Sequence, residues 1–452
     1  MKKILYTLII ALAGFSSFAQ SELSLPMFKD VFQSSYINPV VRPEFTTSIG
    51  LPGVSGIYGQ FIFNGTVPSD VFEERNNEIV LLPDQLLKES KDKNLIHANF
   101  NADLFHLRFK SNNWFYWFGA RLHSDNQFTY AKDLIGLAVQ GNGAYIGKTI
   151  DLSNTTINLS QYLETTIGAS KSYKKWVFGG RFSMLYGLAN VQFNPDDLSI
   201  QIQDSTYAHT FSANAVMNTA GIPRNKYNEP DFEHVDGDWA LDNYSSLKNR
   251  GYALSMGASY SYDSRTTFTV AISDLGFINW KDSVMNYRVK GNETFHGLDA
   301  LSDWLYNRET NPDSLLEDFM DNFDDEKTSK SYRTWLAPKF YLAANYQIAR
   351  RTHFGASFYA VYNHKFYPAF TISLTQGAGR FLNLLASVSA NQRTLTNLGL
   401  GLVVKPGPFQ IYVVADNLYP LINPLKFTNA NIRIGMNLVF GRVVPPAGLP
   451  YR

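Results

Sequence analysis

The sequence of 452 residues predicts an all-β fold, a single transmembrane antiparallel β-barrel of about 14 strands. Three observations predict it: an export signal at the amino end, alternating apolar and polar runs about ten residues long, and a regular order of short and long connections. A large secreted β-sandwich or propeller is the alternative. It fits less well, because its strands would be shorter and its charged fraction higher than the 17% found here.

The amino end has the pattern of a cleavable secretory signal. Lys2 and Lys3 precede an apolar run over residues 4–15, and the small side chains of Ser17 and Ala19 mark a cleavage site. Residues 1–19 are therefore predicted to be a signal peptide. The sequence after it has no run of 18 apolar residues. A mature chain that enters a membrane must then do so as a β-barrel, the other architecture that satisfies all backbone polar groups there.

The alternation of apolar and polar side chains is clearest near the carboxyl end. In residues 339–348, every second side chain is apolar: Phe340, Leu342, Ala344, Tyr346 and Ile348. This run exceeds the roughly five or six residues of most soluble strands. It matches the roughly 9 to 11 residues of a tilted strand that crosses a bilayer.

Segments of this kind occur fourteen times and assign the barrel to residues 54–441. They cover residues 54–63, 99–109, 114–123, 157–170, 176–187, 252–262, 266–275, 339–348, 354–362, 370–374, 382–390, 398–404, 409–413 and 432–440. Six side chains on the apolar face are predicted to contact outer-membrane lipid: Leu384, Leu400, Leu402, Ile434, Leu438 and Phe440. The opposite face carries polar residues such as Arg433 and Asn437, which suits an interior filled with water or protein.

The connections between these segments alternate in length. Every connection after an even-numbered segment is short, whereas long ones follow odd-numbered segments, at residues 64–98, 124–156, 188–251, 276–338 and 416–430. Outer-membrane barrels have short periplasmic turns and longer extracellular loops, so both termini are predicted to be periplasmic, with a tail at residues 442–452. Two extracellular loops contain patterns of short helices, at residues 132–139 and 312–323.

The segment before the first strand, residues 20–53, is interrupted by Pro26, Pro39, Pro43 and Pro52. No long regular element fits between these prolines. The segment could enter the barrel as a hatch or remain in the periplasm, and its composition does not choose between the two.

Composition and motifs exclude several functions. Lys and Arg number 40 against 39 Asp and Glu, so no positive field attracts nucleic acid. The chain has no cysteine, and its eight histidines show no ligand spacing. A glycine-rich phosphate loop and a nucleophile elbow are also missing from the sequence. We therefore expect no enzyme activity, cofactor, metal or catalytic residue.

Several segments carry a family resemblance. They are residues 331–441, which include NLGLGLVVKPGPFQIYVVADNLYP, and residues 37–59 and 130–147. They resemble an uncharacterised family of Bacteroidota outer-membrane β-barrels, over nearly the whole mature chain. That family is similar to the long-chain fatty-acid transporter-like barrels, in which fourteen strands surround a hatch with an Asn-Pro-Ala motif. Asn38, Pro39 and Val40 occupy that place here. The resemblance implies a location in the Gram-negative outer membrane, but residues of a fatty-acid pocket have no recognisable counterpart.

Two functions remain open at this point. The first is a passive conduit for small hydrophobic or amphipathic molecules, which predicts an apolar pocket between hatch and wall and a small hydrophobic ligand. The second is a non-transporting structural subunit of a secretion or assembly complex, with other outer-membrane or periplasmic proteins as partners. It predicts a filled lumen and large ordered loops. Polar inward residues such as Asn345, Asn383 and Asn431 count against an apolar tunnel.

Overall fold

The computed structural model describes residues 22–65, 68–75, 78–224, 248–295, 324–363, 365–391, 397–423 and 428–443. The predicted signal peptide, the predicted helix over residues 312–323 and most of the C-terminal tail lie outside these residues. None of the described helices is long and apolar enough to cross a membrane.

The described strands form a closed antiparallel barrel of 14 strands, so the predicted fold class and strand count are confirmed. The first barrel strand consists of β1 (Thr47–Gly50) and β2 (Ile57–Asn64). The others are β5 (Lys93–Ser111), β6 (Trp114–Ala131), β8 (Thr156–Tyr173), β9 (Trp176–Ile202), β11 (Arg250–Ser261), β12 (Thr266–Trp280), β16 (Lys339–Ala349), β17 (Thr352–Asn363), β18 (Lys365–Ala378), β19 (Leu382–Asn391), β20 (Asn397–Val404), β21 (Phe409–Ala415) and β22 (Asn429–Phe440). The barrel closes because β1 and β2 pair with β5 on one side and with β22 on the other.

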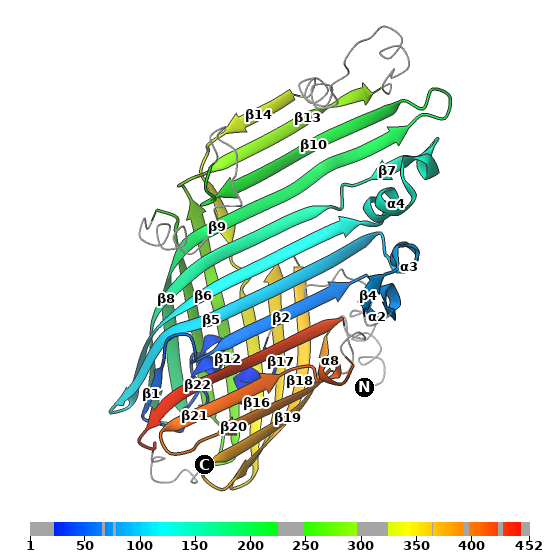
Figure 1. Ribbon diagram of the computed structural model, residues 1–452. Helices are drawn as coiled ribbons and strands as arrows, with labels where there is room; N and C mark the ends of the chain where they lie inside the picture. The colour runs from blue at the N-terminus through cyan, green and yellow to red at the C-terminus, as the bar shows by residue number, and fades with distance from the viewer. Residues whose placement is uncertain are drawn as a thin grey trace.

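One wall of the barrel is much taller than the opposite wall (Figure 1). Strands β5, β6 and β8 have 18 or 19 residues and β9 has 27, whereas β19, β20 and β21 have 10, 8 and 7. Above the barrel, β9 continues into a sheet with β10 (His209–Ala220), β13 (Met285–Phe295) and β14 (Asp324–Thr328). The connections expected at residues 188–251 and 276–338 therefore contain strands, because β9 keeps pairing beyond the barrel.

Small elements occupy the end of the barrel with the long connections. They are α2 (Pro68–Val71), β3 (Phe72–Arg75), β4 (Glu78–Leu81), α3 (Pro83–Glu89), α4 (Lys132–Gln140), η3 (Asn142–Tyr145), β7 (Thr149–Asp151), β15 (Tyr332–Trp335) and α8 (Tyr419–Ile422). Helix α4 corresponds to the helix predicted over residues 132–139, and it ends at Gly141, which has a φ of 71°. Below, we name the two ends of the barrel the long-connection end and the short-turn end.

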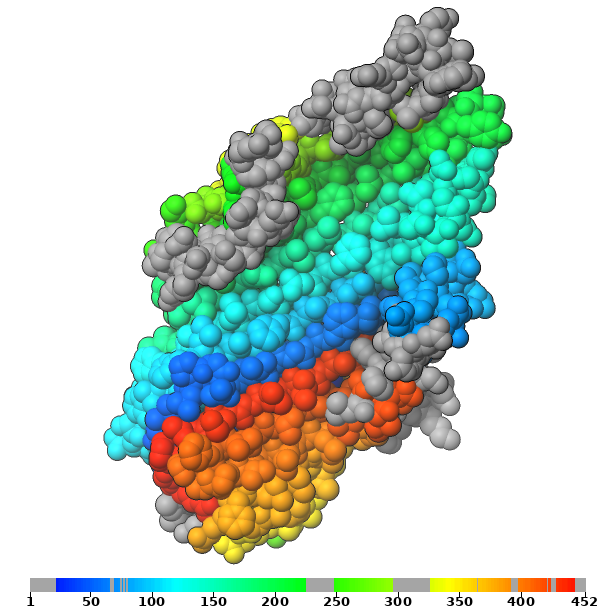
Figure 2. Space-filling model, viewed as in Figure 1, coloured from blue at the N-terminus to red at the C-terminus, as the bar shows by residue number. Residues whose placement is uncertain are grey.

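Many large apolar side chains are exposed on the outside of the barrel. Figure 2 shows one face of the molecule, with neighbouring strands of the wall in order of their colour along the chain. The predicted lipid-facing side chains of Leu384, Leu400, Ile434 and Phe440 are 44%, 50%, 46% and 45% exposed, and those of Leu402 and Leu438 are half-buried. Residues between them turn into the barrel, as the period of two requires. Contact of these six side chains with lipid remains a prediction.

The first barrel strand is interrupted between β1 and β2. Seven positions separate Gly50 from Ile57, yet their partners on β22, Asn437 and Ile434, are only three positions apart. The extra residues of segment 51–56 leave the hydrogen-bond ladder and form a wide bulge. Within it Ser55 is fully buried.

Candidate functional site: the plugged lumen

Residues 22–46, which we name the plug, lie inside the barrel. The plug contains two short 3-10 turns, η1 (Leu25–Met27) and η2 (Phe32–Tyr36), and all eight residues of these turns are buried. Figure 1 shows these turns behind β5 and β22, within the barrel. Pro26, Pro39 and Pro43 limit regular structure in between. The sequence left open whether this segment enters the barrel or remains in the periplasm. In the structure, its described residues lie in the lumen.

One side of the plug packs against an apolar wall. Six plug side chains take part: Leu23, Leu25, Met27, Phe28, Val31 and Ile37. Across from them lie the inward side chains of β12 and β16–β21, among them Tyr341, Tyr359, Leu385, Val403 and Tyr412. We name this contact the apolar seam. The polar inward residues of these strands had argued against an apolar interior, but the layer at the height of the plug is apolar.

Glycines on the barrel wall make room for the plug. A Cβ on Gly401 would lie 2.1 Å from Phe28, and one on Gly399 would lie 2.9 Å from the Ser24 hydroxyl. Both distances are shorter than real Cβ contacts, so β20 can approach the plug only without side chains there. In the sequence NLGLGLVV, the leucines form an apolar outer face. The glycines between them leave no side chains on the inner face, which contacts the plug.

Polar contacts attach the start of the plug to the wall. Both oxygens of Asp416 accept backbone hydrogen bonds, from the N of Leu23 at 3.0 Å and from the N of Ser24 at 2.7 Å. The Ser24 and Ser387 hydroxyl oxygens are 2.7 Å apart. Glu22 forms an ion pair with the buried Arg433 of β22. Burial raises the pKa of Asp416, opposed by the hydrogen bonds from Ser24.

A second attachment lies at the short-turn end. Lys405, in the turn after β20, is 2.7 Å from the Glu44 carboxylate and 3.5 Å from the Asp30 carboxylate. Asn383 also donates a hydrogen bond to Asp30. Burial raises the pKa of Asp30, although the positive charge of Lys405 opposes this shift. We name Asp30, Glu44, Asn383 and Lys405 the latch, because these contacts join Asp30, within the plug, and Glu44, near its end, to the barrel wall at the short-turn end.

The other side of the plug faces cations and aromatic rings. Phe32 stacks on His106 with ring centroids 3.8 Å apart, and the Arg121 guanidinium lies 3.9 Å from the centre of the Tyr36 ring. Such cation–π contacts stabilise a charge that has little access to water. Burial and the nearby Asp103 raise the pKa of Tyr36 well above its ordinary value, so its hydroxyl is neutral.

A buried charge network lies beside Tyr36. Glu164 of β8 is 3.0 Å from Arg121 and 2.8 Å from His123, and its other oxygen accepts a 2.6 Å hydrogen bond from Ser183. The network continues through Arg181 to Asp274, at 2.6 Å, and from Asp274 to Lys339 at 2.7 Å. Buried charges are paired in this way because an isolated one is very costly.

The predicted hatch motif lies at a bend of the plug. The Oδ1 of Asn38 accepts a 3.2 Å hydrogen bond from the backbone N of Val40, which closes an Asx turn. A Cβ on Gly257 would lie 3.3 Å from Val40, so the valine found in place of alanine fits against a glycine of β11. The role of Asn38 and Pro39 as a hatch motif remains a prediction.

The described lumen contains buried side chains that are paired within the chain. Among the described residues, no group of three His, Asp or Glu side chains could hold a metal ion. Two of the carboxylates in the described lumen, Glu164 and Asp274, contact cations of the same chain.

A family model described as a family of unknown function (DUF5723) matches residues 39–416. The chain belongs to this family. The membership confirms the predicted resemblance to an uncharacterised family. A search of the curated proteins gives no match.

Among solved structures, this DUF5723 barrel is similar to the toluene transporter TbuX of Ralstonia pickettii. The two share 9% identity over 91% of this chain and 95% of that chain, with a TM-score of 0.44. The Pseudomonas putida toluene transporter TodX has 9% identity, covers 91% and 94%, and has a TM-score of 0.44. A Pseudomonas aeruginosa FadL homologue has 9% identity, covers 90% and 94%, and has a TM-score of 0.45.

The sequence did not predict the contacts of the plug in this DUF5723 barrel. A signal for them exists: Asp103, Arg121, Glu164, Arg181 and Arg433 are charged residues within membrane-length strands. Charged residues at such positions usually face the interior and have a function. Their partners could not be found, because Arg433 and Glu22 are 411 positions apart.

Proposed function

We propose that this DUF5723 barrel is an outer-membrane conduit for small hydrophobic or amphipathic molecules, and that the plug closes it at rest. The observation that carries the proposal is the apolar seam. Movement of the plug would uncover a surface of Tyr341, Tyr359, Leu385, Val403 and Tyr412. Apolar walls with a few hydroxyl groups bind apolar or amphipathic molecules and offer little to sugars or ions.

The location in the outer membrane has its own support. The outer face is apolar, the strands alternate, and the turns are short at one end and long at the other. Barrels with this combination span the Gram-negative outer membrane.

A disulfide lock tests whether the plug must move. The Ser24 and Ser387 hydroxyl oxygens are 2.7 Å apart, and the chain has no cysteine. The variant Ser24→Cys/Ser387→Cys can therefore form one disulfide that fixes the plug to β19. Uptake of radiolabelled toluene is measured in Gram-negative cells that express the barrel, with Ser24→Cys alone as control and glucose as hydrophilic probe.

We expect the natural chain and the single variant to accelerate toluene uptake and not glucose uptake. The oxidised double variant should lose this acceleration and regain it after reduction. Acceleration that survives oxidation would contradict the role of the plug as a gate. No acceleration by a correctly assembled barrel would contradict the conduit and favour a structural subunit of an envelope complex.

A further inference from the structure

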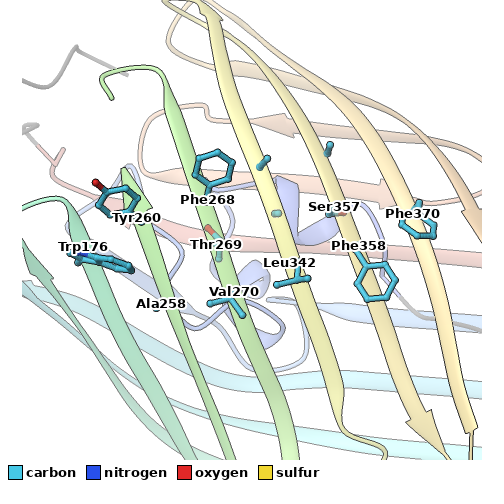
Figure 3. A pocket seen from close by; sticks show the side chains of 13 residues that line it. Trp176, Ala258, Tyr260, Phe268, Thr269, Val270, Leu342, Ser357, Phe358 and Phe370 are labelled. Carbon is cyan, nitrogen blue, oxygen red and sulfur yellow. The ribbon is translucent and has the colours of Figure 1, made fainter. Parts of the chain in front are cut away.

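An apolar groove of about 630 Å³ runs across the outer face of β9, β11, β12, β16, β17 and β18. Its floor contains the small side chains of Ala258, Ala344 and Ala356. Larger side chains border it, and Figure 3 shows Phe268, Val270, Leu342, Phe358 and Phe370 on neighbouring strands. The register explains the depression, because Ala344 and Ala356 are directly paired and Phe268 pairs with Ala344.

The turns below this groove are strongly basic. Four consecutive short turns, all described by the structure, join β8 to β9, β11 to β12, β16 to β17, and β18 to β19. They carry six cations, Lys174, Lys175, Arg265, Arg350, Arg351 and Arg380, which are all exposed. Their one acidic side chain is Asp263, which accepts hydrogen bonds from the backbone N of Arg265 and Thr266 at 2.7 Å and 2.6 Å. We name these six cations the basic rim.

The four turns are neighbours in space. The backbone oxygen of Lys175 accepts a hydrogen bond from Ser261, that of Arg265 from Gln347, and that of Arg351 from Gly377. Each bond joins one turn to the next strand along the barrel. The basic rim therefore follows the same wall as the groove.

Turn geometry does not account for the lysine at position 174. Lys174 has a φ of 51°, and the equivalent residue of the β5–β6 turn, Asn112, has a φ of 53°. Two-residue hairpin turns of this type favour Asn and Gly, as at Asn112. Lysine at position 174 is conformationally less favourable than asparagine or glycine. Its Nζ lies 5.4 Å from the centre of the Tyr173 ring, and the Nζ of Lys175 donates a 2.9 Å hydrogen bond to the backbone oxygen of Tyr262, while both side chains remain exposed.

The groove and the basic rim are separated by a distance that suits one lipid. Phe268 is three residues from Arg265 and Ala344 is six from Arg350, which corresponds to roughly 10 to 20 Å along the strands. One leaflet of a bilayer contributes roughly 15 Å of hydrocarbon. Trp176, next to Lys175, is 41% exposed, and tryptophan is favoured at the boundary between headgroup and hydrocarbon.

We propose that this wall binds an anionic diacyl phospholipid of the leaflet at the short-turn end, with its phosphate on the basic rim and an acyl chain in the groove. Charge complementarity selects an anionic headgroup, and the apolar groove selects a chain over a free anion. The proposal requires the barrel to lie in a membrane, but it does not depend on transport.

Retained lipid tests the proposal. The purified barrel is equilibrated with equal amounts of phosphatidylglycerol and phosphatidylcholine, and bound lipid is counted by native mass spectrometry. The rim variant is Lys174→Gln/Lys175→Gln/Arg350→Gln/Arg351→Gln. The control is Lys88→Gln/Lys91→Gln/Lys93→Gln/Lys148→Gln, which removes the same charge from exposed residues at the long-connection end. A third variant, Ala344→Phe, fills the groove.

We expect a preference for phosphatidylglycerol of at least about fivefold in the natural chain and the control, and loss of most of it in the rim variant. Ala344→Phe should reduce the amount of retained phosphatidylglycerol at least about twofold by removing space for the chain. Equal preference in the rim variant and the natural chain, or an equal loss in the control, would overturn the proposal.

Two further measurements use only the natural chain, so they remain valid even if the variants fail to fold. The preference should collapse at about 1 M salt, where the Debye length is about 3 Å. It should persist in excess inorganic phosphate at constant ionic strength, because free phosphate has no chain for the groove. A preference that resists salt, or that phosphate abolishes, would contradict lipid binding at this wall.

Discussion

The Nε2 of Gln33 in the plug lies 2.8 Å from the backbone oxygen of Ser55 and donates a hydrogen bond to it. Ser55 belongs to the bulge that interrupts the first barrel strand, and its oxygen also accepts a 2.8 Å hydrogen bond from the Tyr412 hydroxyl. The same Nε2 lies 2.9 Å from the Asp103 carboxylate. The plug therefore satisfies backbone and side-chain groups that the interrupted strand leaves unpaired.

Gln33→Ala should loosen the plug. Its removal leaves Asp103, which is fully buried, without this donor, and an unsatisfied buried partner costs about 1–3 kcal/mol. Hydrogen exchange of residues 23–36 should become faster, while exchange of β16–β18 stays unchanged. Unchanged protection of the plug would show that Gln33 does not hold it.

Gly401→Ala should displace the plug from the apolar seam. The new Cβ would lie 2.1 Å from Phe28, and relief of such overpacking costs about 1–3 kcal/mol. Gly59→Ala is the matched control, because a Cβ on this strand glycine meets nothing within 4 Å. Single-channel conductance should rise for Gly401→Ala alone; equal conductance in the two variants would argue against close packing at β20.

Glu164→Gln should destabilise the barrel strongly. The change leaves Arg121 without its 3.0 Å carboxylate partner in a buried position, and breaking a buried ion pair costs about 3–5 kcal/mol. Glu326→Gln provides the comparison, because its pair with Lys330 is exposed and such pairs contribute about 0–1 kcal/mol. Urea unfolding in detergent measures both. Similar midpoints would contradict the buried network.

Docking of the plug should weaken as the pH rises through the titration of Asp30. Burial raises the folded pKa of Asp30, so the folded state binds more protons than the unfolded state, whose pKa is about 3.9. The contribution of Asp30 to stability then falls as the pH rises from its unfolded pKa to its folded pKa, and it is constant above the folded pKa. This carboxyl is surrounded by Lys405, Glu44 and Asn383. The positive charge of Arg108 also interacts with it electrostatically.

Asp30→Asn should remove this pH dependence, because it imitates the protonated carboxyl at every pH. Protease accessibility of the plug as a function of pH measures the effect. A pH dependence that persists in the variant would assign the titration to another group.

Arg at Leu384 or Leu400 should impair insertion by about 2–4 kcal/mol. Both side chains are about half exposed on the outer face, where we predict contact with hydrocarbon. Arg at the inward, half-buried Asn345 is the control and should insert nearly normally. Outer-membrane fractions resolved by electrophoresis give the yield of folded barrel, and normal assembly of Leu384→Arg would contradict the predicted lipid contact.

The sequence by itself determined the barrel. Strand alternation is local, because a period of two places side chains on opposite faces wherever a strand forms. It predicted fourteen strands, the outer face of Leu384 and Leu400, and the inward face of Arg433. The lengths of the connections then predicted which ends of the strands carry short turns.

Only the tertiary structure decided where the plug lies and what the inward charges contact. Gln33 and Asn437 are 404 positions apart and yet are hydrogen-bonded, and no local pattern encodes such a pairing. The sequence also did not predict that β9 extends to Ile202. A strand that continues beyond the membrane and a strand within a loop hairpin have the same alternation of side chains. These features depend on closure of the barrel, which brings the first and last strands together around a segment that has no regular structure of its own.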